Sequence, residues 1–162
     1  MATVKVYPAK PNSLYKDYTG PISYYYKRKL IDFVECTALK GSALAQNDVI
    51  EAIPLDAGEI LVGGFAKIIT AGTASTTAQV GITGDDADGF IASVALDGSA
   101  GAVTAANGAY LLTQSGTSPF AVTWTGSKAI ATDDTLDLLL NASTAVTAGQ
   151  VEVIAIFASY NR

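Results

Sequence analysis

Short hydrophobic runs separated by turn residues follow one another along the chain from residue 30 onward. The runs are rich in Val, Ile, Thr and aromatic residues, which favour β-strands, and no helical period is sustained. Turn signals such as Asn107-Gly108 and Ala148-Gly149 recur at a spacing of roughly 8 to 12 residues, which is typical of a sandwich or barrel. The pattern predicts about eight strands, at residues 30–37, 48–55, 60–70, 76–82, 110–113, 120–125, 135–141 and 151–160.

Three local details refine this all-β prediction. The run at 151–160 has two largely apolar faces, so we expect a strand that is central in its sheet or covered on both sides. The Gly63-Gly64 pair interrupts the run at 60–70 and predicts a bulge or a bend there. The best candidates for a helical turn are residues 43–47 and 88–94, and both are too short to form a layer.

Residues 1–29 differ from the rest of the chain. Pro8, Pro11 and Pro21 interrupt any helix, and six of the eight tyrosines lie in this segment. A tyrosine ring prefers to bury its body while its hydroxyl stays hydrogen-bonded, so such a segment needs a surface to lie on. We therefore predict an extended, basic, tyrosine-rich N-terminal arm at 1–29 and a β-sandwich domain at 30–162.

The net charge of −5 divides unevenly between these two parts. Residues 1–29 contain six Lys or Arg and one Asp, which gives +5, and the remainder carries −10. A basic, aromatic arm fits an acidic protein surface. We expect the partner-binding residues to be the tyrosines of the arm and the basic run that follows them: Tyr7, Tyr15, Tyr18, Tyr24, Tyr25, Tyr26, Lys27, Arg28 and Lys29.

The absence of histidine limits the chemistry that this chain can carry out. Without His, catalysis by Ser-His-Asp or Cys-His arrangements is excluded. Cys36 is the only cysteine, so it forms no intramolecular disulfide and no thiolate metal cluster. Its place in an alternating run favours a buried, unreactive thiol. We expect no enzyme activity, no cofactor, no metal and no small-molecule substrate.

One acidic segment is a possible cation site. The sequence from Asp85 to Gly89 contains three carboxylates, which suit a hard cation such as calcium. However, Gly84 and Ala95 stand where a calcium loop needs its first and last acidic ligands. An acidic surface turn between two strands explains the segment better, and cation binding stays an open alternative.

A second acidic group consists of Asp133, Asp134 and Asp137. Two carboxylates at a suitable separation can hydrolyse a glycosidic bond, so a hydrolase is a formal alternative. Asp133 and Asp134 come just before a predicted strand, where carboxylates commonly cap backbone amides. Capping is the simpler explanation of this group.

Nucleic acid and membranes are poor candidates for partners. Residues 24–29 combine stacking rings with cations, as single-strand binding proteins do, but the −10 of the domain would repel a polyanion. No apolar run approaches the 18 or so residues of a membrane span, and the first residues lack the features of a signal peptide. We therefore expect no nucleic acid, no membrane and a soluble protein.

Several stretches of the chain resemble small structural proteins of tailed bacteriophages. They are the opening Met1-Ala-Thr-Val-Lys-Val-Tyr-Pro-Ala, the triplet Ile31-Asp-Phe, residues 41–52, the run Gly84-Asp-Asp-Ala-Asp-Gly-Phe, residues 134–141 and Gly149-Gln-Val-Glu-Val. The chain looks most like the jelly-roll head decoration, or cement, proteins. The resemblance spans most of residues 1–162 and includes no catalytic or ligand signature.

This resemblance implies a jelly-roll-like antiparallel β-sandwich that binds the outside of the phage head as a homotrimer. Its partner would be the major capsid protein, whose lattice it would stabilise against the pressure of packaged DNA. The expected location is the outer surface of the capsid in the virion, after assembly in the host cytoplasm. The alternative is a phage tail or fibre component whose β-sandwich binds a host glycan.

Overall fold

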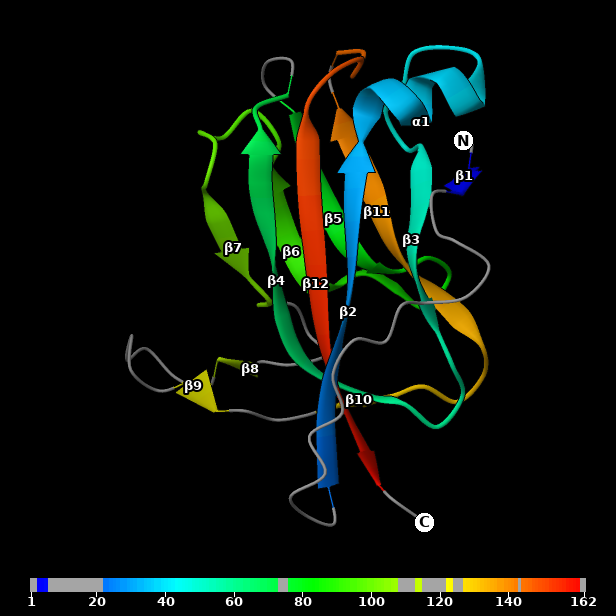
Figure 1. The fold of residues 1–162 in the computed structure, drawn as a ribbon, viewed down its shortest axis with the longest axis vertical. Coiled ribbons are helices and arrows are strands. Elements are labelled where there is room, and N and C mark those ends of the chain that lie inside the picture. The colour runs from blue at the N-terminus through cyan, green and yellow to red at the C-terminus, as the bar shows by residue number, and fades with distance from the viewer. Residues whose placement is uncertain are drawn as a thin grey trace.

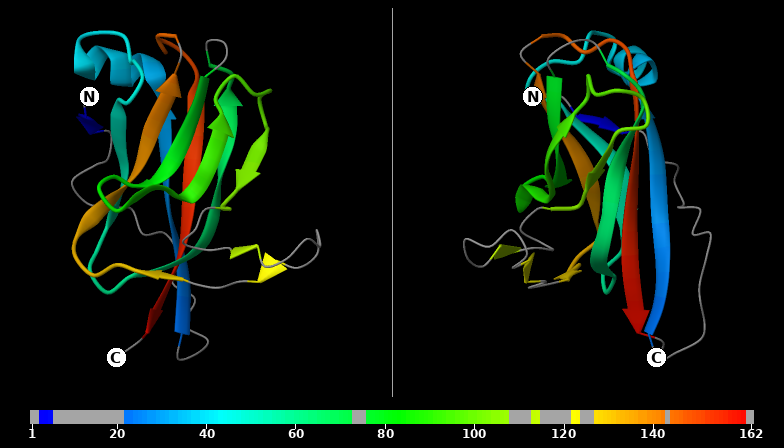
Figure 2. Two further views of the ribbon diagram at one scale, coloured as in Figure 1. Left: turned by 180° about the vertical axis from the view of Figure 1, so that it is seen from behind. Right: turned by 90° about the vertical axis from the view of Figure 1, so that its left-hand side faces the viewer.

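The computed structural model describes residues 3–5, 22–72, 76–107, 113–114, 122–123, 127–142 and 144–160. Within these ranges nearly every element is a strand, and helix α1 (Phe33–Lys40) lies at one end of the molecule (Figure 1). The long strands form two layers that pack face to face, which Figure 2 shows from the side. The predicted all-β, antiparallel β-sandwich is confirmed.

Two five-stranded sheets make up the sandwich. Sheet 1 has the order β1 (Thr3–Lys5), β3 (Val49–Leu55), β11 (Asp134–Ala142), β5 (Thr76–Ile82) and β6 (Asp86–Ala95). Sheet 2 has the order β10 (Lys128–Ala129), β4 (Ile60–Thr70), β12 (Gln150–Tyr160) and β2 (Ile22–Asp32), and β7 (Val103–Ala105) also pairs with β4. β8 (Thr113–Gln114) and β9 (Val122–Thr123) form a separate two-stranded sheet.

The chain crosses repeatedly between the two sheets. The chain passes from β2 in sheet 2 to β3 in sheet 1, then to β4 in sheet 2 and β5 in sheet 1. It later returns through both sheets, so that β11 lies between β3 and β5, and β12 lies between β2 and β4. All pairings in the two sheets are antiparallel except that of β1 with β3, which is parallel and three residues long.

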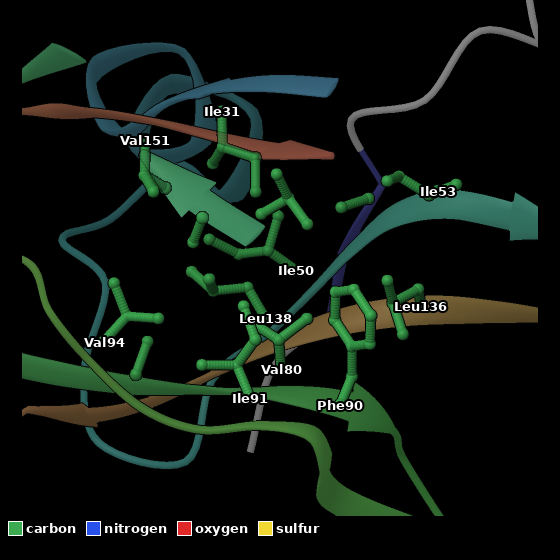
Figure 3. Close-up of a cluster of buried hydrophobic side chains, with 14 of the residues drawn as sticks. Ile31, Ile50, Ile53, Val80, Phe90, Ile91, Val94, Leu136, Leu138 and Val151 are labelled. Carbon is green, nitrogen blue, oxygen red and sulfur yellow. The ribbon is translucent and has the colours of Figure 1, made fainter. Parts of the chain in front are cut away.

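Alternate residues of the strands build the core between the sheets. On β11, Leu136, Leu138 and Leu140 are fully buried, as the two-residue period of a strand requires. Figure 3 shows Ile31 and Val151 of sheet 2 approaching the side chains of sheet 1. Each fully buried aliphatic side chain stabilises the fold by about 1.5 to 3 kcal/mol, so this core is the main stabilising contribution.

β12 is the central strand of sheet 2, as the predicted strand at 151–160 led us to expect. It pairs with β2 along all eleven residues and with β4 on its other side. The register against β4 shifts next to Gly63, because Ile156 pairs with Gly63 whereas Phe157 pairs with Leu61. The irregularity predicted at Gly63-Gly64 is therefore confirmed.

Helix α1 replaces the second half of the strand predicted at 30–37. Asp32 ends β2 and caps the helix: its Oδ1 accepts hydrogen bonds from the backbone N–H groups of Val34 at 2.8 Å and Glu35 at 3.4 Å. The helix ends at Gly41, whose φ of 76° allows two hydrogen bonds back to the last turn. Caps at both ends outweigh the β propensity of the residues between them.

The other local predictions have mixed outcomes. Residues 88–94 lie in strand β6 rather than in a helical turn, and residues 43–47 contain a turn and a bridge between Leu44 and Val146. Both helical alternatives are therefore wrong. Strand β6 starts with Asp-Ala-Asp-Gly, and these polar or small residues interrupt the hydrophobic run that would have predicted the strand. The predicted strands at 110–113 and 120–125 lie mostly outside the described residues.

The predicted boundary at residue 29 falls inside β2. Residues 22–29 pair with β12 and belong to sheet 2, so they are part of the sandwich and not of an arm. The tyrosines and basic residues of this segment follow the alternation of a half-buried strand. Aromatic residues are good strand formers, and this property accounts for the segment better than an extended arm does.

Candidate interaction surface

The nine residues predicted to bind a partner differ in their exposure to solvent. Side chains of Tyr24 and Arg28 are exposed, and those of Tyr26 and Lys29 are half-buried. Tyr25 and Lys27 are buried, so their prediction as partner contacts is wrong. The reason is that both side chains point from β2 toward the interior of the sandwich. The remaining three residues lie outside the described part of the chain: Tyr7, Tyr15 and Tyr18.

Lys27 and Tyr25 take part in a buried polar cluster at the β3–β4 turn. The Lys27 side chain is 4% exposed, and its ammonium donates hydrogen bonds to Glu59 Oε2 at 2.8 Å and the Pro54 carbonyl at 2.8 Å. It also lies 3.1 Å from Oδ2 of the exposed Asp56. The Tyr25 hydroxyl donates to the other oxygen of Glu59. The cluster ties β2 of sheet 2 to the turn that leaves sheet 1.

Aromatic packing completes this cluster. The rings of Tyr25 and Phe157 are stacked with centroids 5.5 Å apart, and the Lys27 ammonium lies 5.3 Å from the centroid of Phe157. Burial raises the pKa of Tyr25, and the hydrogen bond to the Glu59 carboxylate raises it further.

The sequence analysis did not identify Glu59 as part of this cluster. The only signal was that Lys27 alternates in phase with Tyr25 and Ile31, which places it on the inward face of β2.

The outer face of sheet 2 is the candidate interaction surface. Register places Arg28, Ile154 and Phe65 in one cross-strand row on this face. We call it the aromatic face; its large apolar members are Tyr24, Tyr26, Leu30, Phe65, Val103, Ile154 and Ile156. By contrast, the alternation of sheet 1 places mainly polar residues outward: Glu51, Thr77, Gln79, Asp137 and Asn141. A sheet face turned to water is normally polar, so the aromatic face is suited to protein contact.

Charges on the aromatic face are few and mostly basic. The Arg28 side chain is about half exposed, and its guanidinium lies 3.5 Å from Glu152 Oε1. At such an exposed site an ion pair contributes little to the stability of the fold. Lys67 is the cross-strand neighbour of Glu152 on β4. The acidic residues of the sandwich lie mainly elsewhere, in sheet 1 and in the turns next to it.

The two acidic groups lie at turns: Asp133 lies against the β3–β4 turn and Asp85 in the β5–β6 turn. Asp133 Oδ1 accepts a hydrogen bond from the backbone N–H of Ala57 at 2.9 Å, so its predicted capping role is confirmed. A hydrogen bond with Asp88 raises the pKa of Asp86, which shows how crowded the negative charge is there. Among the described residues no cluster of three or more His, Cys, Asp or Glu side chains is arranged to hold a metal ion.

Asp137 is buried on the outer side of sheet 1, beneath the β5–β6 turn. Its Oδ2 accepts a hydrogen bond from the backbone N–H of Thr83 at 3.3 Å, and this bond and those with the Thr135 and Thr83 side chains lower its pKa less than burial raises it. Burial is the main cause that raises the pKa of Asp137, and the Glu51 carboxylate adds to it. Its ionised form therefore destabilises the folded protein.

We expect Asp137→Asn to change how stability depends on pH. Folded Asp137 binds its proton more tightly than the unfolded chain does, so the free energy of unfolding falls as pH rises from the unfolded pKa of about 3.9 through the raised folded value. The variant should lack this fall and should gain most over the wild type near neutral pH. Urea unfolding across this pH range measures the difference, and an advantage that grows toward acid pH would contradict the prediction.

A surface hollow lies where β10 approaches the β5–β6 turn. Its volume is about 240 Å³, and it is lined by Ile82, Asp85, Lys128, Ala129, Ile130, Ala131, Thr132 and Asp134. Four of the lining residues are apolar and four are polar or charged, and the Lys128 ammonium pairs with the Asp85 carboxylate. Sequence reasoning gave no sign of this hollow, because its residues come from separate parts of the chain.

Comparisons with known proteins identify the fold. No family model matches the sequence, and no curated protein matches it. Among solved structures, a chain of the capsid of Ralstonia phage GP4 is similar over 99% of both chains, with a TM-score of 0.54 and 17% identity. A chain of the cyanophage Pam1 capsid is similar over 95% of this chain and 94% of its own, with a TM-score of 0.51 and 16% identity.

A third similar structure is the acid-stable capsid of Helicobacter pylori bacteriophage KHP30. The similarity covers 85% of this chain and 89% of the other, with a TM-score of 0.52 and 8% identity. At such identities the comparisons establish a shared fold: the sandwich of this chain occurs in the capsids of three phages. In the described ranges, no helix has the length and apolar character needed to cross a membrane.

Proposed function

We propose that this chain is a structural protein of a phage virion. The similarity to a chain of the Ralstonia phage GP4 capsid is the observation that carries the proposal, since it covers 99% of both chains. Because so little of either chain is left over, the capsid chain consists of the same sandwich and is not a much longer protein with a sandwich inserted. This organisation fits a separate capsid component.

More specifically, we propose a decoration or cement protein on the outer surface of the head. It binds the major capsid protein as a homotrimer, stabilises the lattice and joins the particle in the host cytoplasm. The aromatic face supports this role, because covering its exposed apolar side chains with a partner protein is energetically favourable. We propose no enzymatic role: Asp133 caps a turn and Asp137 is buried, so neither is presented to a substrate.

Multivalency would make modest contacts sufficient. Each aromatic side chain that docks removes about 150 to 250 Å² from water. A trimer that touches the lattice at three sites leaves it only when all three contacts open, so its avidity exceeds the affinity of one contact by orders of magnitude.

The test is binding of the purified full chain to heads of its own phage that lack it. We expect it to sediment with such heads and to raise the temperature at which they release DNA. Binding to isolated tails or to a host glycan, with none to heads, would contradict the proposal and would support a tail or fibre component.

The N-terminal segment can be tested in the same assay. We propose that the part of the predicted arm that precedes β2 contributes to head binding through its tyrosines. We expect serine at Tyr7, Tyr15 and Tyr18 together to weaken binding at least about tenfold, because three aromatic anchors are lost. Leu39→Ser, at a side chain that is 60% exposed on α1, is the control for loss of surface hydrophobicity. Equal binding by the triple variant and the control would remove the arm from the proposal.

A further inference from the structure

Tyr24 and Arg28 form a projecting pair on the aromatic face. Tyr24 is 54% exposed and the Arg28 side chain is 55% exposed. Both residues lie on the outward side of β2, four positions apart, which corresponds to about 13 Å along a strand. Tyrosine and arginine are, with tryptophan, enriched among the residues that contribute most to binding energy in protein interfaces.

The hollow at β10 has the complementary chemistry. Ile82, Ala129 and Ile130 supply apolar walls. Asp85 and Asp134 put two carboxylates at its edge against the single ammonium of Lys128, so its lining carries a net negative charge. Its volume of about 240 Å³ is below the 300 to 1,000 Å³ of pockets for drug-sized ligands, and one large side chain suits it better.

The ring of Tyr24 cannot enter the hollow of its own molecule. Register places Tyr24, Ala158, Ile60 and Ala129 in one row across β2, β12, β4 and β10. Three strand spacings separate Tyr24 from Ala129, or about 14 Å. Eleven paired residues hold β2 in place, so Tyr24 and Arg28 can reach a β10 hollow only on another molecule.

We propose that Tyr24 of one copy of this chain inserts into the β10 hollow of a second copy, with Arg28 facing the carboxylates at the edge of that hollow. The tyrosine ring covers the apolar walls, and the guanidinium meets a negative surface on a chain whose copies otherwise repel each other at a net charge of −5. The contact joins two different patches, so it repeats from copy to copy and closes a ring if the rotation allows. It agrees with the proposed homotrimer and is independent of any role in a capsid.

Disulfide trapping in the full chain tests the contact directly. The native Cys36 is buried, and burial raises the pKa of its thiol to about 12. Cys36 therefore does not form disulfides under mild oxidation. In the double variant Tyr24→Cys with Ala129→Cys, the new thiols are too far apart to join within one molecule. The cysteine replaces the Tyr24 ring and weakens the contact, but each disulfide bond is covalent and accumulates whenever the two patches meet. We therefore expect covalent multimers of the 16.6 kDa chain on a non-reducing gel, and only monomer from either single variant. Monomer from the double variant, or multimers from Tyr24→Cys alone, would overturn the proposal.

Sedimentation equilibrium gives an independent test without new cysteines. We expect the wild type to self-associate and Tyr24→Ser or Arg28→Asp to raise the dissociation constant at least about tenfold, which corresponds to about 1.4 kcal/mol. Val103→Ser is the matched control, since Val103 is 58% exposed on the same face. Combining Arg28→Asp with Asp134→Arg should restore association. A monomeric wild type, a Val103→Ser effect as large as that of Tyr24→Ser, or no restoration by the exchanged charges would overturn the contact.

Discussion

Replacing Glu59 with alanine is expected to lower the free energy of unfolding by about 3 to 5 kcal/mol. The substitution removes the carboxylate that accepts hydrogen bonds from the Lys27 ammonium and from the Tyr25 hydroxyl. Lys27 is 4% exposed and cannot recover hydration without opening the sandwich. Breaking one side of a buried ion pair costs more than the pair contributes, because the other charge stays buried. Urea unfolding followed by tryptophan fluorescence or circular dichroism measures the loss.

Two further variants separate this explanation from a general effect of removing a charge. Asp56 also contacts Lys27 but is 63% exposed, so Asp56→Ala should cost no more than about 1 kcal/mol. The double variant Lys27→Met with Glu59→Leu should recover much of the stability, since neither charge is then left alone. If Glu59→Ala cost no more than Asp56→Ala, the buried cluster would have no special role in stability.

Gly64→Ala is the second substitution with a large expected effect, again about 3 to 5 kcal/mol, from overpacking together with an unfavourable backbone conformation. A Cβ atom at Gly64 would lie 2.1 Å from the carbonyl oxygen of Ile154 and 2.7 Å from Cζ of Phe90. The φ of Gly64 is 147°, which L-residues rarely adopt. Backbone and a buried ring would both have to shift to make room.

The adjacent glycine provides the control. A Cβ atom at Gly63 would meet no other atom within 4 Å, and Gly63 has no positive φ, so Gly63→Ala should change the free energy of unfolding by less than about 1 kcal/mol. Soluble yield and urea unfolding of the two variants give the comparison. Equal behaviour of Gly63→Ala and Gly64→Ala would show that β4 can move away from β12, contrary to the close approach of the two strands at Gly64.

Much of the fold could be predicted from the sequence, because continuous hydrophobic runs and turn residues report local structure directly. The strands predicted at 60–70 and 76–82 coincide with β4 and β5. The error at 30–37 arose because Asp32 and Gly41 cap a helix, and the two caps act over eight residues that also suit a strand. Strand β6 was missed because its first four residues are polar or small.

The candidate site was harder to predict, because its features depend on residues that are distant in sequence. Lys27 is neutralised by Glu59, 32 positions away, and no local pattern shows that pairing. Tyr24 and Arg28 were predicted as contact residues on composition, and the structure places both on an exposed face. Their buried neighbours Tyr25 and Lys27 had the same composition, so only the alternation of β2 distinguishes the two pairs.

The central position of β12 has a consequence for the order of folding. The ribosome completes β2 and β4 long before β12. β2 and β4 do not pair with each other, because β12 lies between them in the sheet. Sheet 2 therefore forms only after nearly the whole described chain has been synthesised, and pairings between such distant segments fold slowly. A chain that stops before β12 has no assembled aromatic face. Only chains that contain β12 therefore display this surface for association.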